Sequence, residues 1–502
     1  MKHLFIDDGD VAAIDNLARR LHQPRKFRGN AVIRPEHRWE NCALQIRTAP
    51  AWDPVDGLYK LIYLGSAEGP DPEVKLDVTG APSGGEAHYC LATSEDGVNW
   101  EKPFQGLYHY GVPDWRGEPL GTENNILPTA RGMLVGPLRD PKETDEQRRF
   151  KGLAYRDGGL QPMVSADAVH WETGGEPLSS SDEHHLTLDE ERGLFIASVK
   201  HGGPYGRSFY VSTSADFVTW SDQELAFCAD QVDQENGRAR LQRFFDDADL
   251  LTPVYNRPEE YRTDVYNFAV FPYEGLYVGT AVMHHWSAKH PPSYENVDSR
   301  KTVELACSRD LKTWERVAGR APFLELSPVG DGSAYDTGQM VLANRPIQRN
   351  NELWFYYTAL RHRSLSIEDT LHRKYLDAGA ICLARLRLDG FVSLAGGPEW
   401  GSVLSTPLVV DGPALHVNAD AWRGRVAAEI VDAGTGAVIP GYSRQDAIPA
   451  MVDATDLELR WSAGADLSSL AGRTVQVRFW LWEAEIYSYW LGESGVPSPA
   501  LR

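Results

Sequence analysis

The sequence predicts an all-β protein, a five-bladed β-propeller followed by a C-terminal antiparallel β-sandwich, from three observations. First, the pattern Ser-x-Asp-x-x-x-Trp occurs four times, each time after a short apolar run. Second, five pairs of apolar segments flank acidic, polar or glycine turns. Third, the sequence pattern changes near residue 396: beyond it, segments of alternating apolar and polar residues lie between Gly/Asp turns. Strand-and-turn repeats at comparable intervals are typical of propellers and solenoids.

The repeated pattern predicts a structural turn. The four copies are Ser94–Trp100, Ser165–Trp171, Ser214–Trp220 and Ser308–Trp314. Ser and Asp side chains close tight turns by bonding nearby backbone amides, and the Trp can pack its apolar face between neighbouring sheets. The segments lack apolar residues at helical spacing. We therefore expect these tryptophan turns to follow the third strand of each blade and to count the blades. The fifth unit, 380–391, lacks the Trp.

The paired segments predict hairpins, each an inner strand followed by a second strand. Their turns lie at 52–57, 140–149, 188–193, 272–275 and 349–352. Five such sheet units imply five blades.

The chain is expected to divide into three parts. Residues 1–35 form an N-terminal segment that packs on the propeller, with a short helix over 10–21 where the apolar spacing is helical. Residues 36–395 form the propeller and carry the catalytic site, and 396–502 form the sandwich.

Composition narrows the function classes. The formal charge of −21 over 502 residues argues against nucleic acid and anionic membrane surfaces as partners. The five cysteines are scattered, without disulfide or metal spacing, and no stretch approaches the length of a membrane span. We expect a cytoplasmic protein with no cofactor and a small carbohydrate as its partner. The sequence leaves the oligomeric state open.

Propeller geometry places the candidate site, because the inner strands all begin beside the central axis. Each of the five inner-strand starts has an acid beside hydrogen-bonding side chains. Paired carboxylates are what glycosidic cleavage needs. The candidate catalytic residues are Asp182 and Asp336, then Glu123 and Glu40, with Asp264 a weaker candidate. The candidate substrate-binding residues are Asn41, Asn124, His184, Tyr266, His285 and Arg361.

Other interpretations of these residues stay open. A single acid before a strand is more often a turn or cap residue than a catalyst. The pairs 184–185 and 284–285 are adjacent histidines, which point to opposite faces of a strand, so we expect no metal site. Arg361 and Arg363 can clamp a carboxylate, sulfate or phosphate, or can balance the acidic rim.

Several stretches resemble the five-bladed propeller glycoside hydrolases of families 32, 43 and 68, most closely family 32-like proteins with a propeller followed by a β-sandwich. They are the tryptophan turns and residues 4–8, 39–40, 124–126, 273–279 and 387–393. In family 32 the nucleophile is an Asp on the first blade, a second Asp stabilises the transition state, and a Glu in a Glu-Cys motif is the acid/base. This chain has Glu40 at the first-blade position and has no Glu-Cys pair. The resemblance therefore implies only that the catalytic acids lie at the starts of inner strands.

Together these observations favour a glycoside hydrolase that acts on a small oligosaccharide or glycoside, such as a fructofuranoside or arabinofuranoside. Three alternatives remain: a glycoside phosphorylase whose basic rim (Lys200, His201, Arg361, Arg363) holds phosphate, a polysaccharide lyase, and a non-catalytic carbohydrate-binding propeller.

Overall fold

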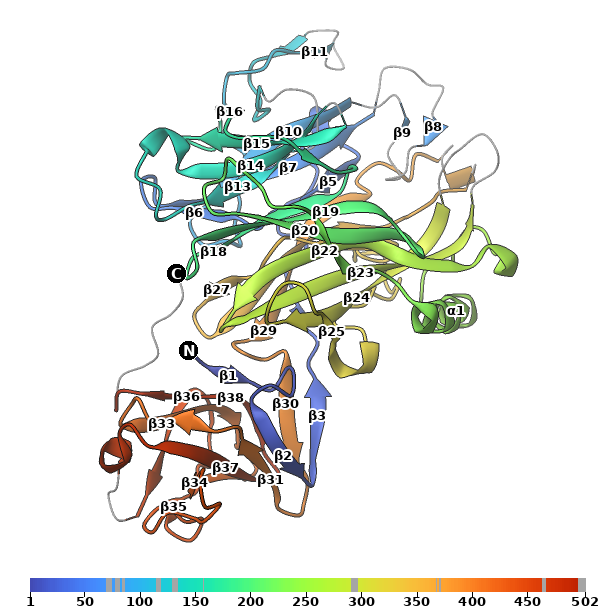
Figure 1. Ribbon diagram of the computed structural model, residues 1–502. Helices are drawn as coiled ribbons and strands as arrows, with labels where there is room; N and C mark the ends of the chain where they lie inside the picture. Colours follow the sequence, from blue (N-terminus) through green and yellow to red (C-terminus); the bar gives the residue numbers. More distant parts are fainter. Residues whose placement is uncertain are drawn as a thin grey trace.

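The protein is nearly all β-structure and has an upper and a lower body (Figure 1). The computed structural model describes residues 1–68, 75–76, 82–83, 86–113, 119–128, 134–156, 158–289, 297–366, 368–369, 372–462 and 466–494. Within that part of the chain no helix has both the length and the apolar character needed to cross a membrane.

The upper body consists of antiparallel sheets that follow one another in chain order. The first group contains β5 (Ala43–Gln45), β6 (Ala51–Asp53), β7 (Leu58–Ala67) and β10 (Glu86–Ser94). The second contains β13 (Leu134–Arg139), β14 (Phe150–Arg156), β15 (Gly159–Ser165), β16 (Glu172–Thr173) and β17 (Leu178–Ser179). The third contains β18 (His184–Asp189), β19 (Leu194–Gly203), β20 (Gly206–Ser214) and β21 (Glu224–Phe227). The fourth contains β22 (Arg262–Tyr273), β23 (Leu276–Lys289), β24 (Val297–Ser308) and β25 (Glu315–Arg316).

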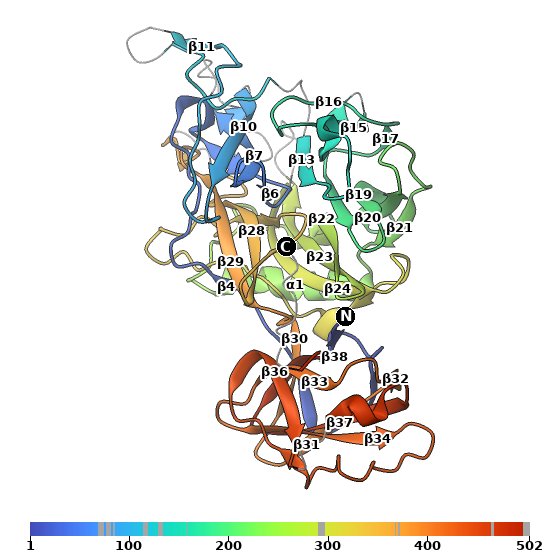
Figure 2. The same cartoon turned by 90° about the vertical axis from the view of Figure 1, so that its left-hand side faces the viewer.

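The last group returns to the first. It contains β4 (Arg25–Lys26), β26 (Gln339–Leu342), β27 (Ile347–Arg349), β28 (Glu352–Leu360) and β29 (Gly379–Arg387). β29 pairs with β5 in parallel, so the last and first groups form one sheet, and in Figure 2 the orange strands lie beside the blue ones. Two short ribbons stand apart, β8 (Lys75–Leu76) with β9 (Pro82–Ser83) and β11 (Tyr110–Pro113) with β12 (Pro119–Gly121).

The predicted hairpins are confirmed, because their turn residues fix the register locally. Tyr273 pairs with Leu276 across the Glu274-Gly275 turn, and Asp189 pairs with Leu194 at the end of the 188–193 turn. Glu274 has φ 47° and Gly275 has φ 81°, the left-handed conformation that a tight hairpin turn requires.

The tryptophan turns share one geometry in all four copies. The Ser hydroxyl lies 3.0–3.1 Å from the first Asp carboxylate oxygen, which accepts two backbone N–H groups at 2.7–2.9 Å. The Trp rings pack on the sheets: Trp314 lies edge-on to Phe268, with 5.0 Å between ring centroids. Asp and Trp are thus used in folding, as predicted.

The predicted helix over 10–21 is wrong. This segment forms β2 (Val11–Asp15) and β3 (Leu17–Leu21), separated by Asn16 with φ 51°. β2 pairs with β31 (Gly401–Ser405) and β3 with β30 (Val392–Gly396). Partners almost 400 residues away decided this conformation, whereas the apolar spacing alone suited a helix. Residues 25–33 then run along β29 in the upper body.

The lower body has two sheets that share one apolar core. The first contains β1 (His3–Leu4), β3, β30, β33 (Ala414–Asp420), β35 (Ala447–Ile448), β36 (Asp453–Trp461) and β38 (Glu485–Gly492). The second contains β2, β31, β32 (Leu408–Val409), β34 (Arg425–Asp432) and β37 (Thr474–Trp482). Leu415 and Val417 from one sheet and Val477 and Phe479 from the other meet in this core, which also takes in Phe5.

A helix interrupts the upper body where the sequence predicted strands and turns throughout. α1 (Gln231–Asp246) lies between β21 and β22 in the chain and packs on β22 and β23. The side chain of Asp230 accepts from the backbone of Asp233, whose side chain accepts from Asp230 in return. This reciprocal cap satisfies two N–H groups that a helix start leaves free.

Candidate functional site

A cavity of about 490 Å³ opens on the third sheet of the upper body. Its wall is formed by the residues before β18, the end of β19 and the start of β20. The lining residues are Ser180, Ser181, Asp182, Lys200, His201, Gly202 and Arg207. The expectation that an inner-strand start and the end of the next strand lie on one rim agrees with this wall.

Two ion pairs line or border the cavity. The carboxylate of Asp182 is 62% exposed and pairs with the ammonium of Lys200, which is 8% exposed. The guanidinium of Arg207 donates to Oδ2 of Asp264 at 3.0 Å. Asp264 is buried directly behind Arg207, so one carboxylate faces solvent and the other is withdrawn from it.

Asp264, near the start of β22, shares hydrogen bonds with His284 and Trp286 of β23. Its Oδ1 lies 3.1 Å from His284 Nδ1, and Trp286 Nε1 donates to Oδ1 at 3.2 Å. His284 Nδ1 also lies 3.2 Å from an Arg207 N–H group and 3.0 Å from the Trp286 N–H group. Arginine and indole nitrogens donate, so Nδ1 is an acceptor and the ring proton is on Nε2, 2.7 Å from Ser299 Oγ.

The surroundings of Asp264 and His284 affect their charge states. The Trp286 N–H group lies within hydrogen-bond distance of both Asp264 Oδ1 and His284 Nδ1, so these two acceptors share a donor. Burial raises the pKa of Asp264 above its usual value, against the attraction of Arg207 and the hydrogen bond from Trp286. Burial lowers the pKa of His284 well below its usual value, and Arg207 adds to that shift. Both shifts favour the neutral form of the group concerned.

Deeper in the sheet Glu183 is tied to Arg47. The Arg47 guanidinium donates to both carboxylate oxygens of Glu183, at 2.5 and 2.6 Å, and Asn267 donates to one of them at 3.1 Å. Burial alone would raise the pKa of Glu183, but the charge and hydrogen bonds of Arg47 outweigh it and hold the pKa well below its usual range. Glu183 is a fixed anion and is unsuited to donating a proton.

Tyr266 lies among several cations. Nζ of Lys301 is 2.9 Å from the centroid of its ring, Nζ of Lys200 is 5.7 Å away, and Cζ of Arg363 is 6.0 Å away. Burial, with a contribution from Glu183, raises the pKa of Tyr266 to about 12, so the phenol keeps its proton at neutral pH.

The structure brings three predicted residues to this region: Asp182, His184 and Tyr266. His184 is buried, and its ring nitrogens lie 3.2 Å from the backbone oxygen of Asp182 and 3.1 Å from that of Leu153. His184 thus sets the position of the Asp182 backbone.

Asp336 and Glu40 are buried with internal partners and are not among the lining residues. Asp336 pairs with Lys26 at 2.7 Å and accepts from the Tyr357 hydroxyl at 3.1 Å. Glu40 accepts from the Tyr63 hydroxyl at 2.6 Å and pairs with Lys102. Lys26 comes from β4, so the Asp336 pair ties the N-terminal segment to the last sheet.

The remaining predicted residues lie elsewhere. Glu123 is exposed. Asn124 donates to the backbone of Tyr108 and Gly121, and Asn41 accepts from the backbone of Glu68. Arg361 stacks on Tyr335, with Cζ 4.0 Å from the ring centroid. These contacts stabilise loops beside the strands.

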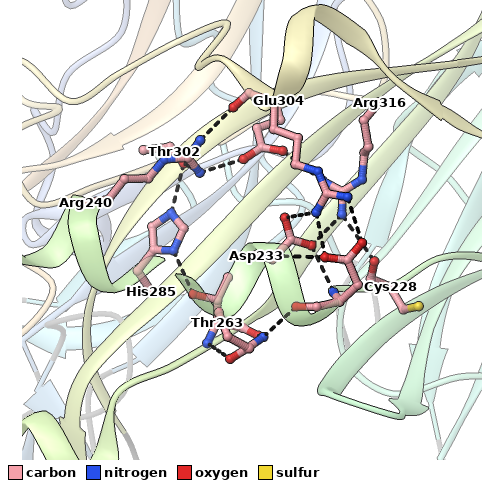
Figure 3. A network of polar contacts seen from close by, with 11 residues as sticks. Cys228, Asp233, Arg240, Thr263, His285, Thr302, Glu304 and Arg316 are labelled. Carbon is pink, nitrogen blue, oxygen red and sulfur yellow. Dashed lines mark hydrogen bonds and ion pairs between the residues drawn. The ribbon is translucent and has the colours of Figure 1, made fainter. Parts of the chain in front are cut away.

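His285 lies beside α1, with Thr263 and Thr302 next to its ring (Figure 3). Its ring nitrogens lie 3.0 Å from the hydroxyls of Thr263 and Thr302. Adjacent residues of a strand point to opposite faces, so His284 reaches Asp264 while His285 lies under the helix.

Sequence reasoning missed Arg47, Arg207 and Lys301. Arg207 and Lys301 belong to third strands, β20 and β24, whose starts the hairpin pattern did not place on the rim. A signal was present for Lys301: the run Asp298-Ser-Arg-Lys301 puts three charged residues in a strand that is buried along its length. Within the described residues no group of three or more His, Cys, Asp or Glu side chains is arranged to hold a metal ion.

No protein-family model matches the chain, and no curated protein sequence matches it either. Solved structures do show similarity. A glycosyl hydrolase from Bacteroides ovatus is 10% identical, with 73% of this chain and 94% of that one covered and a TM-score of 0.41. A β-1,2-mannobiose phosphorylase from Listeria innocua is 12% identical, with 72% and 96% covered and a TM-score of 0.38. A family 32 β-fructofuranosidase from Bombyx mori is 11% identical, with 93% of each chain covered and a TM-score of 0.38.

These are distant similarities to carbohydrate-active enzymes, the group that the sequence resembles. Their low identities and TM-scores leave the function to be argued from the site.

Proposed function

We propose that the upper body is a five-bladed β-propeller and the lower body a β-sandwich. The apolar clusters between successive strand groups support this arrangement, as does the pairing of β29 with β5 that brings the last group back to the first. The shared core of the two lower sheets supports the sandwich.

We further propose that the chain is a glycoside hydrolase whose site is the cavity at Asp182, Lys200 and Arg207. One observation carries this proposal: an exposed carboxylate, Asp182, lines the cavity, and a buried carboxyl group with a raised pKa, Asp264, lies behind Arg207 of the cavity wall. Carboxyl groups that their surroundings hold in opposite protonation states can serve as the acid and the base or nucleophile of glycosidic cleavage.

In this scheme Asp264 gives its proton to the leaving glycosidic oxygen as the bond to the anomeric carbon breaks. Asp182 either attacks that carbon or takes a proton from the water that does so. Arg207 covers Asp264 on the cavity side and must move when substrate binds for Asp264 to reach the leaving oxygen. The resemblance to family 32 makes small furanosides the first substrates to test, and Asp264 replaces Asp336 as the second carboxylate.

The test is a screen of chromogenic furanosides and pyranosides in phosphate-free buffer with the wild type, Asp182→Asn, Asp264→Asn, Asp336→Asn and the exposed control Asp222→Asn. We expect Asp182→Asn and Asp264→Asn to lose about 10²- to 10⁴-fold in kcat, as when a general acid or base is removed. Asp222→Asn should match the wild type. If folded Asp264→Asn keeps its turnover and folded Asp336→Asn loses it, Asp336 and not Asp264 is the general acid.

A further inference from the structure

The region behind the cavity holds more positive than negative side chains. Its cations, named here the cationic cluster, are Arg47, Lys200, Arg207, Lys301 and Arg363. Its acids are Asp182, Glu183 and Asp264. Each acid is already engaged by one member of the cluster: Asp182 by Lys200, Glu183 by Arg47 and Asp264 by Arg207.

Lys301 is the more deeply buried of the two lysines in this cluster. It lies in β24 with 1% of its surface exposed, and its Nζ has no hydrogen-bond acceptor among the described residues. The face of the Tyr266 ring lies against this amine, 2.9 Å from Nζ to the ring centroid. Burial of an ammonium group without a hydrogen-bonded anion is unfavourable.

The surroundings of Lys301 increase this cost. Burial lowers the pKa of Lys301 well below its usual value, and Arg363, Arg47 and Arg207 lower it further, against the opposing charge of Glu183. Such an amine gains most from a bound anion, because the anion restores its proton and supplies the missing acceptor.

Lys200 connects this amine to the cavity. Its side chain lines the cavity, and its Nζ lies 5.7 Å from the same Tyr266 ring that Lys301 contacts. Arg207 lines the cavity as well, so two members of the cluster are reachable by a ligand and Lys301 lies behind them.

We propose that the cationic cluster is an oxyanion subsite centred on Lys301, which binds a phosphate or carboxylate group of a ligand that enters past Lys200 and Arg207. This deepens the proposed function, and rests on it for the identity of the adjoining cavity. Two sources have this chemistry. Inorganic phosphate can replace water as the acceptor: the glycosidic bond breaks, a bond forms between the anomeric carbon and a phosphate oxygen, and the leaving oxygen takes the proton of Asp264. Alternatively, the group belongs to an acidic sugar that is itself the substrate.

Binding is measured by titration calorimetry and by thermal unfolding, with inorganic phosphate, sulfate and glucuronate as separate probes. The variants are Lys301→Met, a second cluster variant, Lys200→Met, and the matched control Lys312→Met. Lys312 is an exposed lysine paired with Glu224, remote from the cluster in its contacts.

We expect the wild type and Lys312→Met to bind the anion equally and Lys301→Met to bind it at least tenfold more weakly. Without ligand, Lys301→Met should unfold at a higher temperature than the wild type, because a buried unpaired amine is replaced by an apolar side chain of similar length. Lys200→Met should also weaken binding. Sulfate keeps its charge across neutral pH, so its affinity should fall as the pH rises and the Lys301 amine loses its proton.

The probes separate the two sources. If the wild type binds phosphate but does not bind glucuronate, phosphate is the acceptor. If it binds glucuronate but does not bind phosphate, the ligand is an acidic sugar. The absence of binding by all three probes to the wild type, or equal affinity in folded Lys301→Met, overturns the subsite. Because binding is read without turnover, a failure to cleave neutral glycosides would count against the hydrolase and leave this result intact.

Discussion

Two charged clusters share β24 of the fourth sheet, which contributes Lys301 to one and Glu304 to the other, and they differ in how their charges are paired. In the cationic cluster behind the cavity, the Lys301 amine has no hydrogen-bond acceptor among the described residues. On the α1 side of the sheet, the residues named here the helix clamp are Asp230, Asp233, Arg240, Glu304, Arg316 and Arg320, three acids and three arginines (Figure 3).

Every charge of the helix clamp has a partner within the clamp. Arg316 bridges Asp233 at 2.6 Å and Glu304 at 2.8 Å. Arg320 bridges Asp230 at 2.6 Å and Asp233 at 2.8 Å. The hydrogen bond and charge of Arg320 hold the pKa of Asp230 at about 2, although its partial burial opposes this. A cluster in which every charge is paired stabilises the fold. The cationic cluster instead leaves the Lys301 amine without an acceptor among the described residues, as expected of a site that binds an anionic ligand.

The largest effect on stability is expected from breaking the clamp at its centre. Asp233→Ala leaves Arg316 and Arg320 each without one of their carboxylate partners and removes half of the α1 cap. Loss of one partner from a buried ion-pair network costs about 3–5 kcal/mol of unfolding free energy. Urea denaturation of the wild type, Asp233→Ala and the exposed helix-end control Asp246→Ala measures this, and the control should stay within about 0.5 kcal/mol. An unfolding free energy unchanged in Asp233→Ala would remove the distinction between the two clusters.

A smaller loss is expected where α1 touches the sheet. A Cβ on Gly237 would lie 1.9 Å from Thr263 Oγ1 and 3.0 Å from His285 Nδ1. Gly237→Ala gains about 1 kcal/mol of helix propensity, but overpacking against a stiff β-branched side chain costs about 1–3 kcal/mol. We expect a net loss of up to about 2 kcal/mol in urea denaturation.

The double variant Gly237→Ala, Thr263→Ala tests the cause of that loss. Removal of Oγ1 should make the Gly237→Ala substitution less costly, so the two changes are not additive. Strictly additive losses would mean that the helix does not approach the sheet as closely as described.

The sequence predicts local structure well and distant pairing poorly. The hairpin at Glu274-Gly275 and the four tryptophan turns were predicted because each is closed by residues within a few positions of one another. The 10–21 segment was predicted wrongly because β30 and β31 decide its conformation. α1 was overlooked because its apolar residues are sparse, although the Asp230–Asp233 cap was a readable start signal.

The same division applies to the site. Asp182 was identified because an inner-strand start next to the end of its partner strand follows from hairpin geometry. Lys301 and Arg207 depend on how third strands of two sheets approach each other, and local pattern does not determine this. Asp336 and Asp264 occupy equivalent positions in the sequence pattern, and the contacts of Lys26 with one and of His284 with the other distinguish them.

The smallest predicted effect concerns the two neighbouring histidines of β23, which border the two clusters separately. In the protonated form of Asp264 that the proposed mechanism needs, His284 Nδ1, 3.1 Å from Oδ1, can accept the carboxyl proton and stabilise the neutral group, while His285 bonds to Thr263 and Thr302. In His284→Leu the neutral form loses its acceptor, so the pKa of Asp264 should fall. Three charged groups face His284 and Asp264: Arg207 on β20, Lys301 on β24, and Arg363 in the segment after β28. They are unchanged in this variant and favour the ionised form of Asp264.

Because Asp264 must be protonated to act as an acid, the alkaline limb of the profile of kcat against pH should move to lower pH in His284→Leu, by about one unit or about 1.4 kcal/mol. His284→Gln, whose amide oxygen can accept the same proton, should restore part of the shift. His285→Leu is the matched control: its stability can change, but the limb should stay in place. A limb that moves equally in His284→Leu and His285→Leu would mean that both histidines act through the fold, and that Asp264 does not hold the proton on which the reaction depends.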